Sequence, residues 1–241
     1  MCVIFFAYRQ HPEYPLILLA NRDEFYERPT AAAQSWEDFP DIFAGRDLVH
    51  GGTWLGINKS GRVAAVTNYR DPRAAPGKFS RGDLVGDFLK LDVGVEDYLR
   101  QIKARAADFS GFNLLVGEIG AKAQKLGYYS NREDRIKILE PGIYGLSNHL
   151  LDTPWRKVEQ GKAAVAKLLQ NGGLEKQKYL EILADKTLAA DADLPETGIG
   201  YEREKLLSAI FIETPVYGTR SSSLVLVDKD YEISLDERNF Y

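Results

Sequence analysis

Apolar residues in the first third of the chain occur in short runs that are typical of β-strands. Residues 2–8 and 16–20 are apolar and rich in β-forming residues, and a turn with Pro12 and Pro15 separates them. Such a pair predicts a β-hairpin. Further short runs predict strands at residues 42–45, 53–58 and 62–68. The chain is therefore expected to begin inside a strand.

A helical block follows these strands. Ser80 can cap a helix over residues 81–91, and the next helix carries apolar residues spaced to share one face: Val95, Tyr98, Leu99, Ile102 and Ala106. Further helices are predicted after Pro154 and over residues 179–190 and 203–212. The remaining predicted strands are residues 112–118, 124–129, 136–139, 144–147, 222–228 and 231–235.

The order of these elements predicts the fold class. Strands and helices come in separate runs, which favours an α+β fold over alternating βαβ units. The chain contains no repeat and no low-complexity segment, and its 241 residues, 44% of them hydrophobic, are enough for a packed core. We therefore expect one domain over residues 1–241.

Charge and composition exclude several classes of protein. Lys+Arg 31 and Asp+Glu 35 give a net charge of −4, which offers no long-range attraction to nucleic acid. The apolar runs are much shorter than the ~20 residues that span a bilayer. Arg9 and His11 also follow the first run too soon for a secretory signal. We expect a cytoplasmic protein with no transmembrane segment and no nucleic-acid partner.

Cysteine, histidine and methionine are scarce in this chain. The single cysteine excludes an intrachain disulfide and Cys-rich metal clusters, and the single methionine is Met1. No metal site is expected. An imidazole ligand for haem would have to come from His11, His50 or His149.

Cys2 directly follows the initiator methionine, and this position allows an unusual chemistry. If Met1 is removed, the thiol and the α-amine belong to one residue, and their ordinary pKa values, about 8.5 and about 8, lie close together. The amine can then accept the thiol proton near neutral pH, directly or through a water, so Cys2 is a candidate nucleophile with its own base. The alternative interpretation is a small apolar residue in a buried strand.

Polar residues gather where predicted strands end. Residues 21–24 read Asn-Arg-Asp-Glu. If the first two strands pair antiparallel, Arg22 lies beside Cys2, where a guanidinium lowers the pKa of a thiol. A solvated surface cluster explains the same residues equally well. Other strand ends carry Asn68, Asn148 and residues 218–223. Their carboxamide and backbone N–H groups are candidate oxyanion donors, although such residues are also ordinary in turns.

The segment of residues 44–56 is rich in glycine and includes Trp54. Paired glycines let a backbone approach a ligand or another strand closely, so the segment is either a structural turn or a wall of a substrate site. It has neither the ending of a P-loop nor the glycine spacing of a dinucleotide site. His50 could pair with Cys2 as a Cys-His dyad, and His149 is the alternative partner.

Together these motifs resemble the NRDE family, which is the family of the transport and Golgi organisation protein two. The resemblance extends from the Met-Cys start to the last hairpin and includes the Asn-Arg-Asp-Glu signature. The residues that carry it are 1–2, 21–29, 44–47, 51–56, 67–68, 147–148 and 218–221. It implies the fold of the N-terminal nucleophile hydrolases, a four-layer αββα sandwich.

Within those hydrolases the resemblance is to the cysteine branch, which includes bile-salt and penicillin V amidases. It implies an N-terminal Cys nucleophile, an Arg and an Asp at the end of the second strand, two Asn near the oxyanion or the amine, and a late Arg. The matching positions are Cys2, Arg22, Asp23, Asn68, Asn148 and Arg220. The amidases read Arg-Asn-x-Asp where this chain reads Asn-Arg-Asp-Glu, so either Asp23 or Glu24 takes the carboxylate role.

Two functions are compatible with this resemblance. In the first, the chain is an amide or thioester hydrolase that requires no cofactor and acts on a small acyl substrate. Trp54, Phe25 and Tyr26 would line its acyl pocket, with His50 and His149 beside them, although the aromatic residues would look the same in a core. In the second, the same cleft binds haem or a lipid or acyl-CoA without catalysis, for trafficking, and arginines pair with the ligand's carboxylates.

Overall fold

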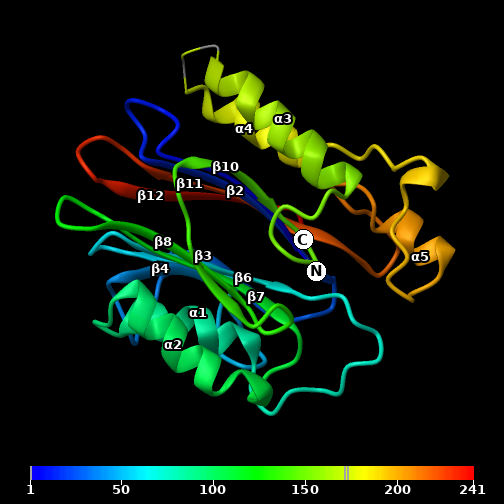
Figure 1. Cartoon of the computed structure of the whole chain (residues 1–241), viewed down its shortest axis with the longest axis horizontal. Coiled ribbons are helices and arrows are strands. Elements are labelled where there is room, and N and C mark those ends of the chain that lie inside the picture. Colours follow the sequence, from blue (N-terminus) through cyan, green and yellow to red (C-terminus); the bar gives the residue numbers. More distant parts are fainter. Residues whose placement is uncertain (1, 171, 173) are drawn as a thin grey trace.

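The computed structural model describes residues 2–170, 172 and 174–241. These residues form two antiparallel β-sheets that stack face to face, with helices covering the outer face of each sheet (Figure 1). The result is a four-layer αββα sandwich of the α+β class. No described helix is both long and apolar enough to cross a membrane.

The first sheet contains the first and the last strand of the chain. Its strand order is β10-β1-β2-β11-β12. The bounds are β1 Cys2–Tyr8, β2 Leu16–Phe25, β10 Gly142–Leu146, β11 Tyr217–Val227 and β12 Ile233–Asn239. The β1–β2 hairpin that the sequence predicts therefore lies at the centre of this sheet, next to the long strand β11.

The second sheet is built from residues between these segments, in the order β3-β4-β5-β6-β7-β8-β9. Its strands are β3 Thr30–Ser35, β4 Ile42–Asp47, β5 Leu55–Asn58, β6 Arg62–Asn68, β7 Phe112–Ile119, β8 Gln124–Ser130 and β9 Arg135–Ile138. Neighbours in this order are also neighbours in sequence, so the sheet is a meander.

The helices divide between the two outer faces (Figure 1). Helices α1 (Arg81–Lys90) and α2 (Val95–Ala104) pack on the second sheet, and α3 (Arg156–Gln170) and α4 (Lys176–Leu183) pack on the first. The short helix α5 (Tyr201–Leu206) and the 3-10 turns Ala106–Asp108 and Asp191–Asp193 complete the described helical structure.

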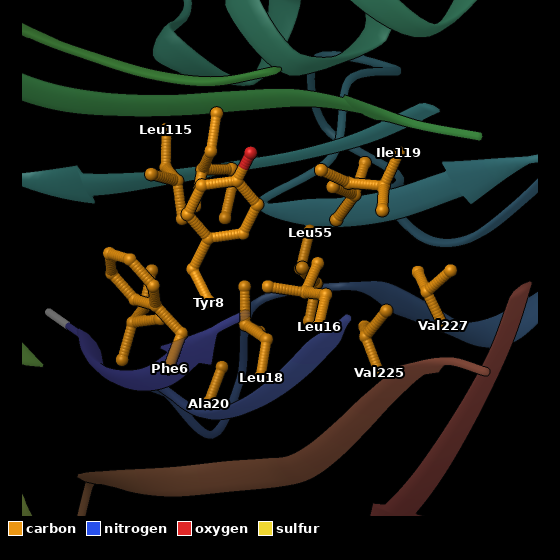
Figure 2. Packing of buried hydrophobic residues seen from close by; sticks show 14 of the residues in the cluster. Phe6, Tyr8, Leu16, Leu18, Ala20, Leu55, Leu115, Ile119, Val225 and Val227 are labelled. Atoms are coloured by element: carbon orange, nitrogen blue, oxygen red, sulfur yellow. The ribbon is translucent and has the colours of Figure 1, made fainter. Parts of the chain in front are cut away.

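Hydrophobic side chains fill the space between each pair of layers. In the inter-sheet layer, Phe6, Leu16 and Leu18 from the first sheet meet Leu55 and Leu115 from the second (Figure 2). Each of these side chains is almost fully buried. Burial of apolar surface is worth roughly 25 cal/mol per Å², so these contacts hold the two sheets together.

Strand alternation assigns the residues of β1 and β2 to opposite layers. Even-numbered residues such as Phe6 and Leu18 point between the sheets, whereas Phe5, Ile17 and Leu19 pack against α3 and α4. Because successive side chains point to opposite faces of a sheet, Cys2 and Arg22 belong to the inter-sheet face, and Asn21 and Asp23 belong to the helix-facing side.

Several predicted boundaries were wrong. Strand β2 continues to Phe25 rather than ending at residue 20, β11 begins at Tyr217 rather than residue 222, and β3 was not predicted. The helix predicted over residues 179–190 ends at Leu183, since the Asp185 carboxylate accepts the backbone N–H of Thr187 in a turn.

The helix predicted over residues 203–212 also ends early, at Leu206. The hydroxyl of Ser208 donates to the carbonyl of Lys205, and the backbone N–H of Phe211 donates to the carbonyl of Asp185. Residues after the helix therefore make hydrogen bonds with other segments, which replaces the helical pattern.

Candidate functional site

Cys2 is the first residue of β1, and its neighbours are fixed by strand pairing. The antiparallel register places Cys2 opposite Arg22 in β2, as the predicted hairpin requires. On the other side, the Ser147 hydroxyl donates to the Cys2 carbonyl over 3.3 Å. Burial raises the pKa of the half-buried Cys2 thiol. Met1 lies outside the described residues, so its removal stays a condition of the chemistry expected for Cys2.

Arg22 reaches across the inter-sheet layer. Its guanidinium lies over the Trp54 ring, 4.2 Å from the ring centroid, in a cation–π contact. Only 5% of Arg22 is exposed, and this burial lowers the pKa of the guanidinium. The contact links the first sheet, through Arg22, to the glycine-rich segment of the second.

A cavity of about 380 Å³ opens beside Cys2. It lies between the end of β2, the segment that leads into β5, and the start of α1. The predicted site residues that line it are Cys2, Arg22, Asp23, His50, Trp54 and Asn68. Other lining side chains include Glu24, Arg28, Asp47, Lys78 and Arg81. The cavity is thus polar on most sides, with Trp54, Val66 and Phe79 as apolar members.

The side chains of the Asn-Arg-Asp-Glu motif, residues 21–24, lie on both faces of β2. Asn21 donates to the carbonyls of Leu183 and Ile210 and accepts from the hydroxyl of Ser222. These bonds explain why β2 continues past its apolar part: the buried amide has partners in the helical layer. Asn21 therefore anchors the strand and takes no part in lining the cavity.

Asp23 and Glu24 differ in their surroundings although both line the cavity. The hydroxyl of Thr219 donates to Asp23 Oδ1 over 2.7 Å. Burial raises the pKa of the Asp23 carboxyl, and the buried Lys157 ammonium acts against that rise. Glu24 is partly exposed and lies 4.0 Å from the Arg28 guanidinium. Asp23 is thus the buried carboxylate of the pair.

Two arginines that sequence reasoning did not select contribute to the cavity. Arg28 pairs with Asp47 at 2.6 Å. Arg81 donates to the carbonyl of Gly111, and burial lowers the pKa of its guanidinium. Arg81 directly follows Ser80, whose hydroxyl accepts from the backbone N–H of Gly82 as the predicted helix cap. The capping motif indicated where α1 begins, but nothing local indicated that α1 begins at the cavity.

The two candidate oxyanion asparagines occupy different positions. Asn68, the last residue of β6, lines the cavity. Asn148 is fully buried, and its amide donates to the carbonyl of Asn68 over 3.1 Å and accepts from the Ser147 hydroxyl. Asn148 is not among the described residues that line the cavity. Its contact instead holds the backbone of Asn68 in place.

The remaining candidates lie away from this cavity. His149, the alternative partner for Cys2, contacts the hydroxyls of Tyr69 and Thr153 and is absent from the described cavity lining. Phe25 is 51% exposed, and Tyr26 stacks on Tyr241. Neither side chain lines the acyl pocket that the sequence suggested, because β2 ends at Phe25 and the chain turns away there.

Arg220 is also outside the Cys2 cavity. Its Nη1 donates to the carbonyls of Phe25 and Arg28, which ties β11 to the end of β2. Arg220 is therefore not among the described residues that line the pocket of Cys2, although the resemblance implies a late Arg there.

The glycine-rich segment forms a wall of the cavity, and two of its glycines are required by close packing. A Cβ at Gly45 would collide with the Trp54 ring, and a Cβ at Gly52 would collide with the backbone of Gly82. The second contact brings the start of α1 next to this segment, where the N–H of Thr53 donates to the Gly82 carbonyl. Among the described residues, no group of His, Cys, Asp and Glu is arranged to hold a metal ion.

Comparison with known proteins identifies the family. A family model described as Transport and Golgi organisation 2 matches residues 1–241. The chain belongs to this family. Its relatives include the Transport and Golgi organization protein 2 homologs of Bos taurus and Homo sapiens, each 39% identical over 256 residues, which cover 99% of this chain and 93% of the relative. The Transport and Golgi organization protein 2 of Drosophila melanogaster is 31% identical over 98% of this chain and 91% of its own.

The fold of this family member is that of the N-terminal nucleophile hydrolases. The crystal structure of the C2A mutant of the conjugated bile acid hydrolase from Clostridium perfringens aligns with a TM-score of 0.54 and covers 100% of this chain and 97% of that one. The sequence identity is 8%. The likeness therefore concerns the fold, and it confirms the expected αββα architecture.

Proposed function

We propose that this chain is an N-terminal cysteine hydrolase that cleaves an amide or thioester bond of a small acyl substrate. The observation that carries the proposal is the position of Cys2: it lies opposite Arg22 in the strand register and lines a polar cavity of about 380 Å³. A nucleophile needs access to substrate, and the place of Cys2 on the lining of this cavity supports the proposal.

The proposed reaction has two steps. The Cys2 thiolate attacks the acyl carbon, and the bond from that carbon to the leaving nitrogen or sulfur breaks as the leaving group takes a proton. Water then attacks the acyl-enzyme, releases the carboxylic acid and returns the proton to sulfur. Asn68 is the proposed oxyanion donor, because its side chain lines the cavity and Asn148 holds its backbone.

Removal of Met1 is part of this proposal. Burial raises the pKa of the Cys2 thiol, so few molecules carry a thiolate at neutral pH without a nearby base. A free α-amine on Cys2 supplies that base. Intact-mass measurement of the purified chain tests this step, and a chain that retains Met1 throughout would leave the thiol without its proton acceptor.

The deciding experiment is covalent trapping with an acylating probe, such as an activated thioester, followed by intact mass and peptide mapping. The wild-type chain is expected to gain one acyl group on Cys2 and to lose it with time. Cys2→Ser should acylate far more slowly, and Cys2→Ala should not acquire the group. Arg100→Gln is the matched control, since Arg100 is an exposed residue of α2. Equal labelling of Cys2→Ala would refute the proposal.

A second function is supported by the charge of the cavity. Four cationic side chains line it against three carboxylates, and this excess of positive charge suits a non-catalytic carrier of an anionic ligand such as haem, a lipid or an acyl-CoA; the cations are Arg22, Arg28, Lys78 and Arg81, and the carboxylates are Asp23, Glu24 and Asp47. His50 is the histidine on this lining that could approach a haem. In that case Cys2→Ala should bind the ligand as tightly as wild type and no acyl group should transfer. Haem titration of Cys2→Ala and His50→Ala separates the two functions.

A further inference from the structure

Arg22 borders a second, smaller cavity in addition to the one that Cys2 lines, which we call the Cys2 cavity. This second cavity has a volume of about 170 Å³ and lies where β2 and β11 meet β3 and the end of β12. Its lining includes Arg22, Thr30, Arg220, Ser221, Asn239 and Tyr241. We call it the arginine cavity. None of the described residues that line it also lines the Cys2 cavity, apart from Arg22.

Three residues that line the arginine cavity carry buried polar groups with no hydrogen-bond partner among the described residues. Arg22 Nη1, Arg220 Nε and the Ser221 hydroxyl are each buried without a hydrogen-bond partner among the described residues. The three residues are 5%, 8% and 2% exposed. Buried donors without partners are rare in native proteins, because each loses its contacts to water. The three residues that carry these groups all line one small cavity, which points to a ligand there.

The backbone explains why these groups converge. Ser221 lies opposite Arg22 in the β2–β11 register, so the two side chains share a face. The register shifts between Thr219 and Ser221, which makes Arg220 the extra residue of a β-bulge. Bulges redirect side chains, and this one aims Arg220 at the same cavity. The two carbonyls that accept from Arg220 Nη1 then fix the guanidinium in place.

The charge of the arginine cavity defines the ligand. Two guanidinium groups line it, and none of its described lining residues is Asp or Glu. The hydroxyls of Ser221 and Thr30 and the amide of Asn239 add neutral hydrogen-bonding groups. Arginine binds oxyanions of planar or tetrahedral shape through several N–H groups at once. Since one water takes up ~30 Å³, a cavity of this size has room for a small oxyanion and a few waters.

We propose that the arginine cavity binds a small oxyanion, either a free phosphate-type anion or the carboxylate of a small organic molecule, and that its occupancy changes the reactivity of Cys2 through Arg22. The anion accepts hydrogen bonds from Arg22, Arg220 and Ser221. The Arg22 guanidinium favours the thiolate form of Cys2 by its positive charge. A bound anion partly neutralises that charge, so the thiolate becomes less favourable and Cys2 reacts more slowly.

Binding is tested by calorimetric titration of the full chain with inorganic phosphate and, separately, with acetate, at constant ionic strength set by sodium chloride. Wild type should bind one anion. Arg220→Gln should weaken binding by about tenfold and Ser221→Ala by a few-fold, in keeping with the loss of a charged and of a neutral hydrogen bond. Arg100→Gln, which removes an exposed charge on α2, should bind like wild type.

The two anions distinguish the source of the ligand. Preference for phosphate indicates a tetrahedral oxyanion, and preference for acetate indicates the carboxylate of an organic molecule; either result supports the proposal. Failure of both to bind wild type, or equal weakening in Arg100→Gln, overturns it. Binding that appears only after Tyr241 is deleted also overturns it, because the chain itself would then fill the cavity. Should Arg220→Gln fail to fold, Ser221→Ala carries the same test with the loss of one hydroxyl.

The coupling to Cys2 is tested by the rate of alkylation with iodoacetamide. Phosphate or acetate, whichever binds, should slow alkylation of wild type by about threefold or more at neutral pH, and this effect should vanish in Arg220→Gln. An unchanged rate in the presence of the bound anion overturns the coupling. Both readouts work without any substrate, so the proposal stands or falls independently of the proposed hydrolase activity.

Discussion

The inter-sheet layer has two ends of opposite character, although the same strands build both. Along the inward face of β2, Leu16 and Leu18 pack into an apolar core (Figure 2), and Arg22, four residues beyond Leu18, faces polar cavities. Leu16 and Leu18 are fully buried among other apolar side chains, whereas the polar end has several buried donors without a hydrogen-bond partner among the described residues. The comparison teaches that one continuous strand provides stability at one end and chemical groups at the other.

The largest expected effect comes from the apolar end. Leu18→Ala removes a fully buried side chain and should lower the free energy of unfolding by about 2–5 kcal/mol, because the lost contacts leave a cavity that refills only partly. Urea unfolding measures this loss. The rate of Cys2 alkylation in the folded protein should stay the same. A change in that rate would show that packing at the apolar end affects the reactivity of the thiol at the polar end.

The second effect concerns Lys157, a residue of α3. Its side chain is 3% exposed and interacts electrostatically with Asp23, which follows Arg22 in β2. Burial lowers the pKa of Lys157 to about 8 from 10.5. The folded state therefore binds fewer protons than the unfolded state between these two values, and stability rises with pH through that window, by up to about 3 kcal/mol. Below pH 8 the cost of burying the ammonium is present in full.

Lys157→Met removes this titration while it keeps a long side chain. The free energy of unfolding of the wild type minus that of the variant should increase from pH 8 to pH 10, and the subtraction cancels the tyrosines that ionise in both proteins. Urea titrations at a series of pH values give this difference. A flat difference would mean that Lys157 keeps its ordinary pKa.

A smaller effect is expected where α1 begins at the Cys2 cavity. Ser80→Ala removes the side-chain cap that accepts from the N–H of Gly82 and should cost about 1 kcal/mol of unfolding free energy. Ser80→Asp keeps an acceptor at the same position and should restore most of the loss. If the two variants are equally destabilised in urea, the hydroxyl has no capping role in solution.

The smallest effect on stability is expected at Arg22 itself. Its buried guanidinium includes a nitrogen without a partner among the described residues. Arg22→Gln removes the cost of burying this charged group, but it also removes the favourable contact with Trp54. The two terms oppose each other, and stability should change by less than about 1 kcal/mol. Alkylation of Cys2 at neutral pH should nevertheless slow by about threefold or more, because the thiolate loses a favourable charge. A large loss of stability with an unchanged alkylation rate would contradict this prediction, because Arg22 would then stabilise the fold and have no effect on the thiol.

Much of the fold could be predicted from the sequence because its central strands are apolar throughout. The run at residues 2–8 predicted β1 with its bounds. The predictions were wrong where polar residues continue a strand, as at Asn21 in β2 and Ser221 in β11. The Asn21 side chain is buried against partners from distant segments, the carbonyls of Leu183 and Ile210, and no local pattern shows those partners.

The site was predicted in part for a similar reason. The hairpin alone places Arg22 beside Cys2, and this depends only on residues close in sequence. Arg81 comes from a helix start some sixty residues further along, and only the tertiary packing of Gly52 on Gly82 brings it to the cavity. The position of His149 has the same origin, because its neighbour Asn148 turns toward Asn68 while His149 turns toward Tyr69.

The pairing of Cys2 with Arg22 makes the turn between β1 and β2 sensitive to length. A slip of one residue in that hairpin would turn Asp23 toward the thiol and Arg22 toward the helices, since side chains alternate along a strand. The sign of the charge beside the sulfur would be reversed without any change in composition. Residues 9–15, although remote from the cavity, thereby determine which electrostatic environment the thiol meets.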